Sequence, residues 1–192
     1  MFDLEAFVES CRRVIAEPHA AKAILELMRE AVADPDAVAQ GVPALPPKTG
    51  VLDAPIFRSS EMTVLNVTLR PHACSIAHNH RMWAVIGIYK GEEANTFYRR
   101  GEKRLEAANR RTIHAGEALL LGADVVHAIE NPLDTPTLGL HVYGGDLLGA
   151  ERSMWSPDEK DERAYELPQF YHWCNDLAAA RRAERERAAA AG

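Results

Sequence analysis

The sequence has few cysteines, no long apolar run and no excess of basic residues, and each shortage excludes a class of protein. The three cysteines, Cys11, Cys74 and Cys174, are far apart and odd in number, which predicts neither a disulfide framework nor a zinc knuckle. No apolar run is long enough to span a bilayer, and the N-terminal MFDLEAFVES carries acidic residues where a signal peptide carries basic ones. The formal net charge of -6 argues against a nucleic-acid partner. We therefore expect a reduced, cytoplasmic protein without a membrane or nucleic-acid partner.

The chain is long enough for one domain, and its first fifty residues have helical periodicity. It has 192 residues, of which 47% are hydrophobic, enough for a substantial core. Apolar positions in residues 2–16 predict a helix, Pro18 can begin a second one, and residues 38–42 predict a short helical turn. The segment GVPALPPKTG is rich in Pro and Gly and predicts a linker or an arm that crosses the rest of the fold. We expect residues 1–50 to form a helical arm and linker.

From about Val51 the apolar period changes from helical spacing to two, which is the period of a half-buried strand. About nine short runs bounded by polar or Gly/Pro residues predict an antiparallel barrel or double-sheet jelly roll over residues 51–150. After Gly149 the pattern weakens, and residues 156–159 predict a cap and a turn rather than a strand. Asn175 is expected to cap a final helix, so residues 151–192 form a C-terminal extension of the same structural domain.

The first candidate ligands are His78 and His80, which are separated by one residue. Positions i and i+2 of a strand share a face, so two imidazoles at this spacing converge on one point. The apolar run MWAVIGIY follows and predicts a buried strand. From spacing alone, the pair is either two metal ligands facing a barrel interior or two unrelated histidines.

A second segment, GEALLLGADVVHAIEN, places Gly116, Gly122, His127 and Asn131 in an order that resembles the two-part cupin pattern. The resemblance implies a mainly β fold, the cupin double-stranded β-helix or jelly-roll barrel, with N-terminal helices and a C-terminal helix. It also implies one metal ion held by His78, His80 and His127. The Glu that the pattern expects after His80 is absent, because residues 82–85 are Met, Trp, Ala and Val. The expected ligands are then three neutral imidazoles, which favour an anionic donor such as a thiolate on the metal.

Residues 56–152 are similar to the cysteine dioxygenase family of thiol dioxygenases, closest to its bacterial 3-mercaptopropionate branch. The segments that carry the resemblance are HNHRMWAVIGIYKGEE, VVHAIEN and GLHVYGG. The resemblance implies one Fe(II) per chain and oxidation of a small mercapto-acid, such as 3-mercaptopropionate or cysteine, by O2 to its sulfinate. The implied partners are therefore the thiol and O2.

The same resemblance implies roles for several residues outside the ligand set. His141 and Tyr143 stand at the His and Tyr of the family's Ser-His-Tyr relay, with Gly139 where Ser is expected, so that a water or another donor replaces the hydroxyl. Arg152 stands where the bacterial branch binds the substrate carboxylate, and Arg58 lies near the arginine of the cysteine-specific branch. The aromatic Trp83 is expected to line the barrel, where it shapes the pocket or fills the core. The alternatives without a functional role are a buried tyrosine at position 143 and surface arginines at positions 58 and 152.

Two other functions stay open at this point. One is a metal-dependent cupin enzyme that acts on a non-thiol substrate with Fe, Mn, Ni or Zn, because three histidines do not select one metal. The other is a non-catalytic cupin that binds a small acid. The sequence also leaves the thiol and the oligomeric state open.

Overall fold

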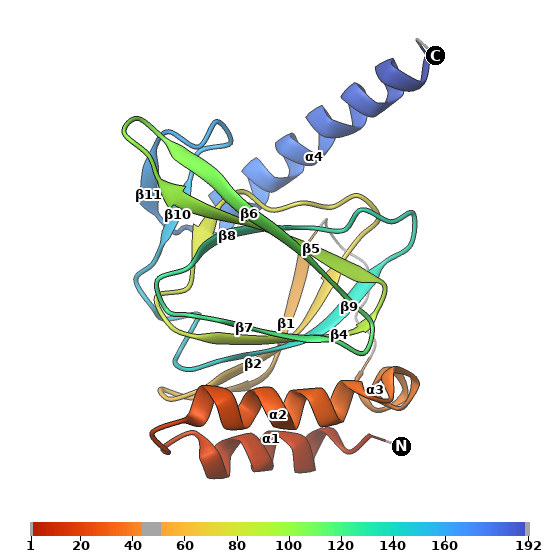
Figure 1. The fold of residues 1–192 in the computed structure, drawn as a ribbon, viewed down its shortest axis with the longest axis vertical. Coiled ribbons are helices and arrows are strands. Elements are labelled where there is room, and N and C mark those ends of the chain that lie inside the picture. The colour runs from red at the N-terminus through yellow and green to blue at the C-terminus, as the bar shows by residue number, and fades with distance from the viewer. Residues whose placement is uncertain (1, 44–50, 191–192) are drawn as a thin grey trace.

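The structure is a computed structural model that describes residues 2–43 and 51–190, with only the backbone of residues 51–54. Two N-terminal helices, α1 (Leu4–Val14) and α2 (Ala20–Val32), lie on one side of a barrel of two sheets, and the long helix α4 (Leu167–Ala190) leaves its opposite side (Figure 1). None of the helices in the described part of the chain is long and apolar enough to cross a membrane.

The N-terminal helices expected from the sequence are confirmed, and local capping explains where they begin. The Asp3 carboxylate accepts a hydrogen bond from the Ala6 N–H at 2.9 Å at the start of α1. Asp34 does the same for the Ala37 N–H at 3.0 Å at the start of α3 (Pro35–Gly41), whose first residue is a proline. Most of the expected linker, residues 44–50, lies outside the described residues.

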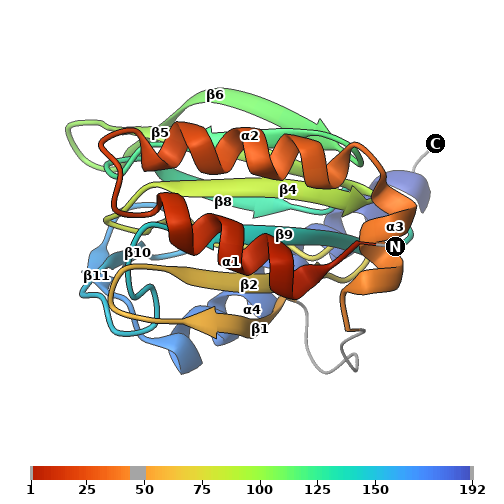
Figure 2. The ribbon, with the colours of Figure 1, turned by 90° about the horizontal axis from the view of Figure 1, so that it is seen from below.

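The first sheet has five antiparallel strands and carries the N-terminal helices on its outer face. Its order is β1 (Val51–Arg58), β2 (Thr63–Leu69), β9 (Thr137–Tyr143), β4 (Ala84–Lys90) and β7 (Ala118–Leu121). Seen from below, α2 runs along β4 and α1 crosses β2 and β9 (Figure 2). The buried side chains of α2 pack on this sheet, and Met28 lies directly over Gly87 of β4. The missing side chain at Gly87 therefore lets the helix approach the sheet closely.

The second sheet has six antiparallel strands and contains the strands of the candidate ligands. Its order is β11 (Glu162–Ala164), β10 (Ser153–Trp155), β3 (His78–Asn79), β8 (Val126–Glu130), β5 (Glu92–Arg100) and β6 (Leu105–His114). Apolar side chains from both sheets meet between them and form the barrel core. The predicted fold class is confirmed: a mainly β, double-stranded β-helix barrel with N-terminal helices and a C-terminal helix.

The sequence interpretation is wrong after Gly149 in two places. First, the turn expected at residues 156–159 is present, but it connects two strands that the sequence did not predict, β10 and β11, and β10 extends the second sheet by pairing Met154 with His78. Second, α4 begins at Leu167 and contains Asn175 in its interior, where the sequence predicted a cap. In both places tertiary packing overrides a weak local pattern, because Met154, Phe170 and Cys174 are buried together.

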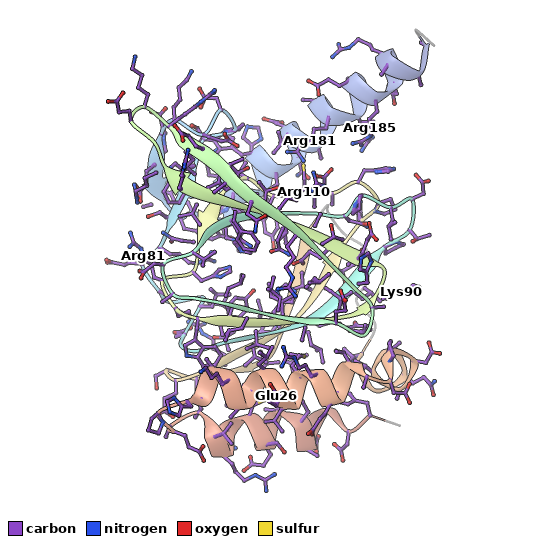
Figure 3. All side chains as sticks on the ribbon, in the orientation of Figure 1. Glu26, Arg81, Lys90, Arg110, Arg181 and Arg185 are labelled. Atoms are coloured by element: carbon purple, nitrogen blue, oxygen red, sulfur yellow. The ribbon has the colours of Figure 1, made fainter. Side chains whose placement is uncertain are left out.

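A charged cluster joins α4 to the barrel. The Glu130 carboxylate of β8 lies 3.1 Å from the Arg181 guanidinium of α4 and 3.4 Å from the Arg110 guanidinium of β6. Figure 3 shows Arg110 and Arg181 on the neighbouring elements, with Arg185 one turn further along α4. The C-terminal half of α4 has few buried positions and extends away from the barrel (Figure 1).

Candidate metal centre

Strand pairing brings the three predicted ligands together. His78 of β3 lies directly opposite His127 in the antiparallel pairing of β3 with β8. Directly opposite residues have neighbouring side chains on one face of a sheet. His80 follows two residues after His78, and Arg81 then has a positive φ of 58° that turns the chain toward β4 in the other sheet. The His-x-His pair therefore does not enter the MWAVIGIY strand but belongs to the opposite sheet.

The three imidazoles form a buried cluster of possible metal ligands. Their nitrogen ligand atoms lie within 4.8 Å of one another, and the group found among the described residues consists of these three histidines without a carboxylate. His78 and His80 are each 6% exposed and His127 is 2% exposed. Imidazole nitrogens bind a transition metal at about 2.0–2.1 Å, so small side-chain rotations suffice to gather them around one ion.

Contacts on the far side of two rings turn the remaining nitrogens toward the cluster. His78 Nδ1 lies 3.1 Å from the Ile76 carbonyl oxygen, and His127 Nδ1 lies 2.9 Å from Asn95 Oδ1. Both oxygens accept, so each Nδ1 carries the proton and each Nε2 keeps its lone pair. The Nε2 atom of His127 is buried and has no hydrogen-bond partner among the described residues. A metal ion would satisfy this nitrogen, so the residues present fit the implied ion.

Burial keeps the cluster in the form that binds metal. Loss of solvent, with the Arg152 charge adding to it, lowers the pKa of His78 to about 4. Burial, followed by the neighbouring histidines, holds the pKa values of His80 and His127 well below 6.5. All three rings are therefore neutral at neutral pH, as metal ligation requires.

A small cavity of about 40 Å³ opens beside the cluster. Its walls combine polar groups with the apolar side chains of Val67, Ile129, Leu147 and Phe170, and the polar groups come from His78, His80, His141, Tyr143, Arg152 and Tyr165. The Arg152 guanidinium carbon lies 3.3 Å from the centroid of the Tyr165 ring, and the Tyr165 N–H donates to the Arg152 carbonyl at 2.7 Å. Arg152 is thereby held at the cavity by a stacking contact and a backbone hydrogen bond.

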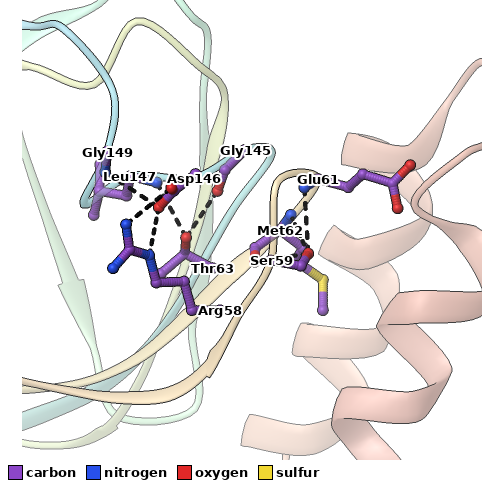
Figure 4. A network of polar contacts seen from close by, with 9 residues as sticks. All are labelled: Arg58, Ser59, Glu61, Met62, Thr63, Gly145, Asp146, Leu147 and Gly149. Atoms are coloured by element: carbon purple, nitrogen blue, oxygen red, sulfur yellow. Dashed lines mark hydrogen bonds and ion pairs between the residues drawn. The ribbon is translucent and has the colours of Figure 1, made fainter.

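The structure does not bring Arg58 and Trp83 to this cavity. Arg58 forms a two-pronged ion pair with Asp146, with Nε–Oδ1 and Nη2–Oδ2 distances of 2.7 and 2.9 Å (Figure 4). This ion pair fixes the loop between Tyr143 and Arg152 on the outside of the cavity. Trp83 is partly buried on the helix side of the first sheet and packs against Gly144.

His141 and Tyr143 do lie together at the cavity. His141 Nδ1 is 3.1 Å from the Tyr143 hydroxyl, and the Tyr143 ring is in edge contact with the His80 ring at a centroid distance of 5.0 Å. Burial, with a smaller contribution from His78, lowers the pKa of His141 to about 3. The imidazole is therefore neutral at neutral pH, with one ring nitrogen protonated.

Two residues around this centre were missed from the sequence. Asn95 of β5 binds His127, and Glu93 two residues earlier accepts a hydrogen bond from Asn95 at 2.9 Å. The sequence signal for them is the alternation in GEEANTFY. Glu93 and Asn95 share one face of the strand, that face is buried, and two buried polar side chains in a row indicate a specific role.

Comparison with known proteins adds three solved structures of similar fold. No family model matches the chain. An uncharacterised double-stranded β-helix protein of Klebsiella pneumoniae is 14% identical over 58% of this chain and 84% of its own, with a TM-score of 0.46. A cupin superfamily protein of Desulfitobacterium hafniense is 16% identical over 57% of this chain and 88% of its own, with a TM-score of 0.45. The DMSP lyase DddQ of Ruegeria pomeroyi is 17% identical over 58% of this chain and 54% of its own, with a TM-score of 0.46.

Proposed function

We propose that the protein is an Fe(II)-dependent thiol dioxygenase that converts a small mercapto-acid and O2 to the sulfinate. The observation that carries this proposal is the buried three-histidine cluster without a carboxylate, with Tyr143 and Arg152 on the same small cavity. Neutral ligands leave a bound divalent ion its full charge, which favours an anionic thiolate as a further ligand.

The proposed reaction is balanced without another reagent. The thiol sulfur gives up four electrons and gains both oxygen atoms, O2 takes up those four electrons, and the proton stays with the product sulfinic acid or goes to solvent. An Fe(II) ion held by His78, His80 and His127 would lower the pKa of the thiol and would supply the redox chemistry for its reaction with O2.

The chain's own residues bind and orient the reactants. The three histidines hold the ion, and the Arg152 guanidinium can bind a carboxylate by two parallel hydrogen bonds. The apolar walls, among them Val67, Leu147 and Phe170, exclude water, and the cavity of about 40 Å³ restricts the substrate to a small molecule. Placing both reactants side by side is the main catalytic contribution, a proximity effect.

The proposed partners are the thiol and O2, without a nucleic acid or a membrane. We propose the cytoplasm as the compartment, which is supported by three buried cysteines that form no disulfide among the described residues, Cys11, Cys74 and Cys174.

The test is an oxygen-electrode screen of the iron-loaded protein with cysteine, cysteamine, 3-mercaptopropionate and mercaptosuccinate, with mass spectrometry of the product. We expect uptake with at least one mercapto-acid and two labelled oxygens per sulfinate from isotope-labelled O2. The His80→Ala variant is the inactive control. Absence of turnover with every thiol, together with no optical change on anaerobic thiol addition, would overturn the proposal and leave a non-thiol cupin enzyme or an acid-binding protein.

A further inference from the structure

A buried carboxylate connects the two halves of the site. Glu93 of β5 is 1% exposed, and its two oxygens point to different partners. Oε1 accepts a hydrogen bond from Asn95 Nδ2 at 2.9 Å, and Oε2 lies 3.7 Å from Nε2 of His141. Glu93 therefore contacts the residue that binds the metal ligand His127 and also the residue that binds Tyr143.

The first contact determines which nitrogen of His127 carries its proton. A carboxylate oxygen accepts, so the Asn95 amide group turns its NH2 toward Glu93. The carbonyl oxygen of Asn95 is then left to face His127 Nδ1, at 2.9 Å. That nitrogen must donate, and the lone pair of His127 is on Nε2, on the metal side.

The second contact determines the proton position on His141. Its Nε2 atom is buried, has no hydrogen-bond partner among the described residues, and lies 3.7 Å from the Glu93 oxygen. This distance is too long for a hydrogen bond, but the interaction is strong in a buried site. A proton on Nε2 is attracted to the carboxylate, whereas a lone pair there is repelled. The Nδ1 atom then accepts from the Tyr143 hydroxyl, at 3.1 Å.

We propose that Glu93 sets the hydrogen-bond direction in two contacts, the one between Asn95 and His127 and the one between His141 and Tyr143. As a result, His127 presents the lone pair of Nε2 to the metal, and the Tyr143 hydroxyl donates a hydrogen bond to His141. A Cβ atom at Gly139 would lie 3.2 Å from His141 Nε2, so position 139, where the relay serine is expected, lies beside this nitrogen. Glu93 approaches the same nitrogen from the opposite sheet. The sequence predicted a water or another donor in this place, and the group found there is an acceptor.

This direction has a consequence for the ligand, which rests on the proposed function. Because the Tyr143 proton is directed to His141, the Tyr143 oxygen acts as an acceptor toward the cavity. It favours a ligand group that carries a proton, such as the ammonium group of cysteine, whereas a thiolate or O2 presents only acceptors to it.

The test reads the protonated ring nitrogens directly by nitrogen NMR of isotope-labelled protein loaded with diamagnetic zinc. In the wild type we expect the His141 proton on Nε2 and the His127 proton on Nδ1. In Glu93→Gln the side-chain oxygen still accepts the hydrogen bond from Asn95, and the side-chain NH2 then faces His141 Nε2. Because that NH2 donates, Nε2 must accept, and the His141 proton should move to Nδ1. The control Glu92→Gln changes a neighbouring carboxylate that pairs with His114 on the other face of β5, and it should leave both rings as in the wild type.

A wild-type His141 proton on Nδ1 would overturn the proposal, and so would an unchanged His141 in folded Glu93→Gln. The wild-type spectrum decides even where the variant does not fold, and disappearance of one ring in His141→Gln assigns the signals. As a second readout, Glu93→Ala should weaken zinc binding by about 10–100-fold, the usual effect of removing a contact behind a ligand. Neither readout involves turnover, so a protein inactive on every thiol would contradict the proposed function and leave this inference intact.

Discussion

At the scale of single residues, the chemistry of the centre depends on which ring nitrogen of each histidine is hydrogen-bonded and which one faces the other ligands. His127 is the clearest case, since its Nδ1 atom is bound by Asn95 and its buried Nε2 atom faces the other two histidines. The ring is thus oriented before any ion binds, which lowers the cost of binding one.

Removal of His127 should therefore abolish tight metal binding while leaving the fold intact. We expect His127→Ala to retain little iron or zinc after dialysis, because two histidines remain of the three. The measurement is elemental analysis beside a circular dichroism spectrum. The exposed His172 provides the matched control, and His172→Ala should keep the wild-type metal content. Equal metal content in His127→Ala and wild type would contradict the assignment of the ligands.

Arg152 and Arg58 test where a substrate carboxylate binds. Arg152 lies at the cavity and Arg58 is bound to Asp146 outside it. We expect Arg152→Ala to lower the kcat/KM ratio of 3-mercaptopropionate to cysteamine by about 10–150-fold, which corresponds to roughly 1.5–3 kcal/mol for a contact to a charged group. Arg58→Ala serves as the control and should leave that ratio nearly unchanged. An intact ratio in Arg152→Ala would place the carboxylate elsewhere.

At the scale of elements, α2 and the first sheet meet at a position that has no room for a side chain. A Cβ atom at Gly87 would overlap the Met28 side chain and approach Val32 Cγ1 at 3.0 Å. Met28 is fully buried, so it cannot move into solvent. This contact attaches the helical layer to the barrel on the side away from the metal centre.

Gly87→Ala should accordingly destabilise the protein by about 1–3 kcal/mol, the usual range for overpacking a core. The measurement is urea unfolding of the metal-free protein. The double variant Gly87→Ala/Met28→Ala should show favourable coupling, because the shortened side chain makes room for the new methyl group. Gly122→Ala is the control, since its Cβ would meet only Val125, at 3.9 Å. A loss as large in Gly122→Ala as in Gly87→Ala would show that overlap with Met28 is not the cause.

The elements also show what could be predicted from the sequence. His78, His80 and His127 could be found because their signal is local, a spacing of two in one segment and a Gly-turn-His order in another. The polar alternation of Glu93 and Asn95 is also local, but their roles could not be predicted, because these depend on the lateral pairing of β5 with β8, which places Asn95 opposite Ile129. No local spacing encodes that register.

The same reason explains the two errors near the C-terminus. The strand β10 has three residues and the first turns of α4 carry a mixed aromatic pattern, so neither has a strong local signal. Both are stabilised by burying Met154 and Phe170 against Ile76, which is a contact between distant parts of the chain.

At the scale of the whole molecule, the buried histidines make stability depend on pH. The unfolded chain binds protons to these side chains near pH 6.5, while folding lowers the pKa of His78 to about 4 and that of His141 to about 3. A lowered pKa in the folded state contributes stability that is complete above the unfolded value and is lost as the pH falls toward the folded value. The loss should therefore begin near pH 6.5 and continue to about pH 4 for His78 and to about pH 3 for His141.

The metal-free protein should lose several kcal/mol across this window, since a shift from 6.5 to about 4 for His78 alone corresponds to roughly 3 kcal/mol. Urea unfolding with a chelator, at steps from pH 8 to pH 4.5, measures the loss. Saturating zinc at one hundred times its Kd should add about 2.7 kcal/mol, and this gain should persist below pH 6.5 because the folded ligands are still neutral there. His172→Gln removes an exposed histidine and should leave the pH dependence unchanged. A metal-free stability that is flat from pH 8 to pH 5 would mean that the histidine cluster is hydrated and readily protonated in the folded protein, contrary to its burial.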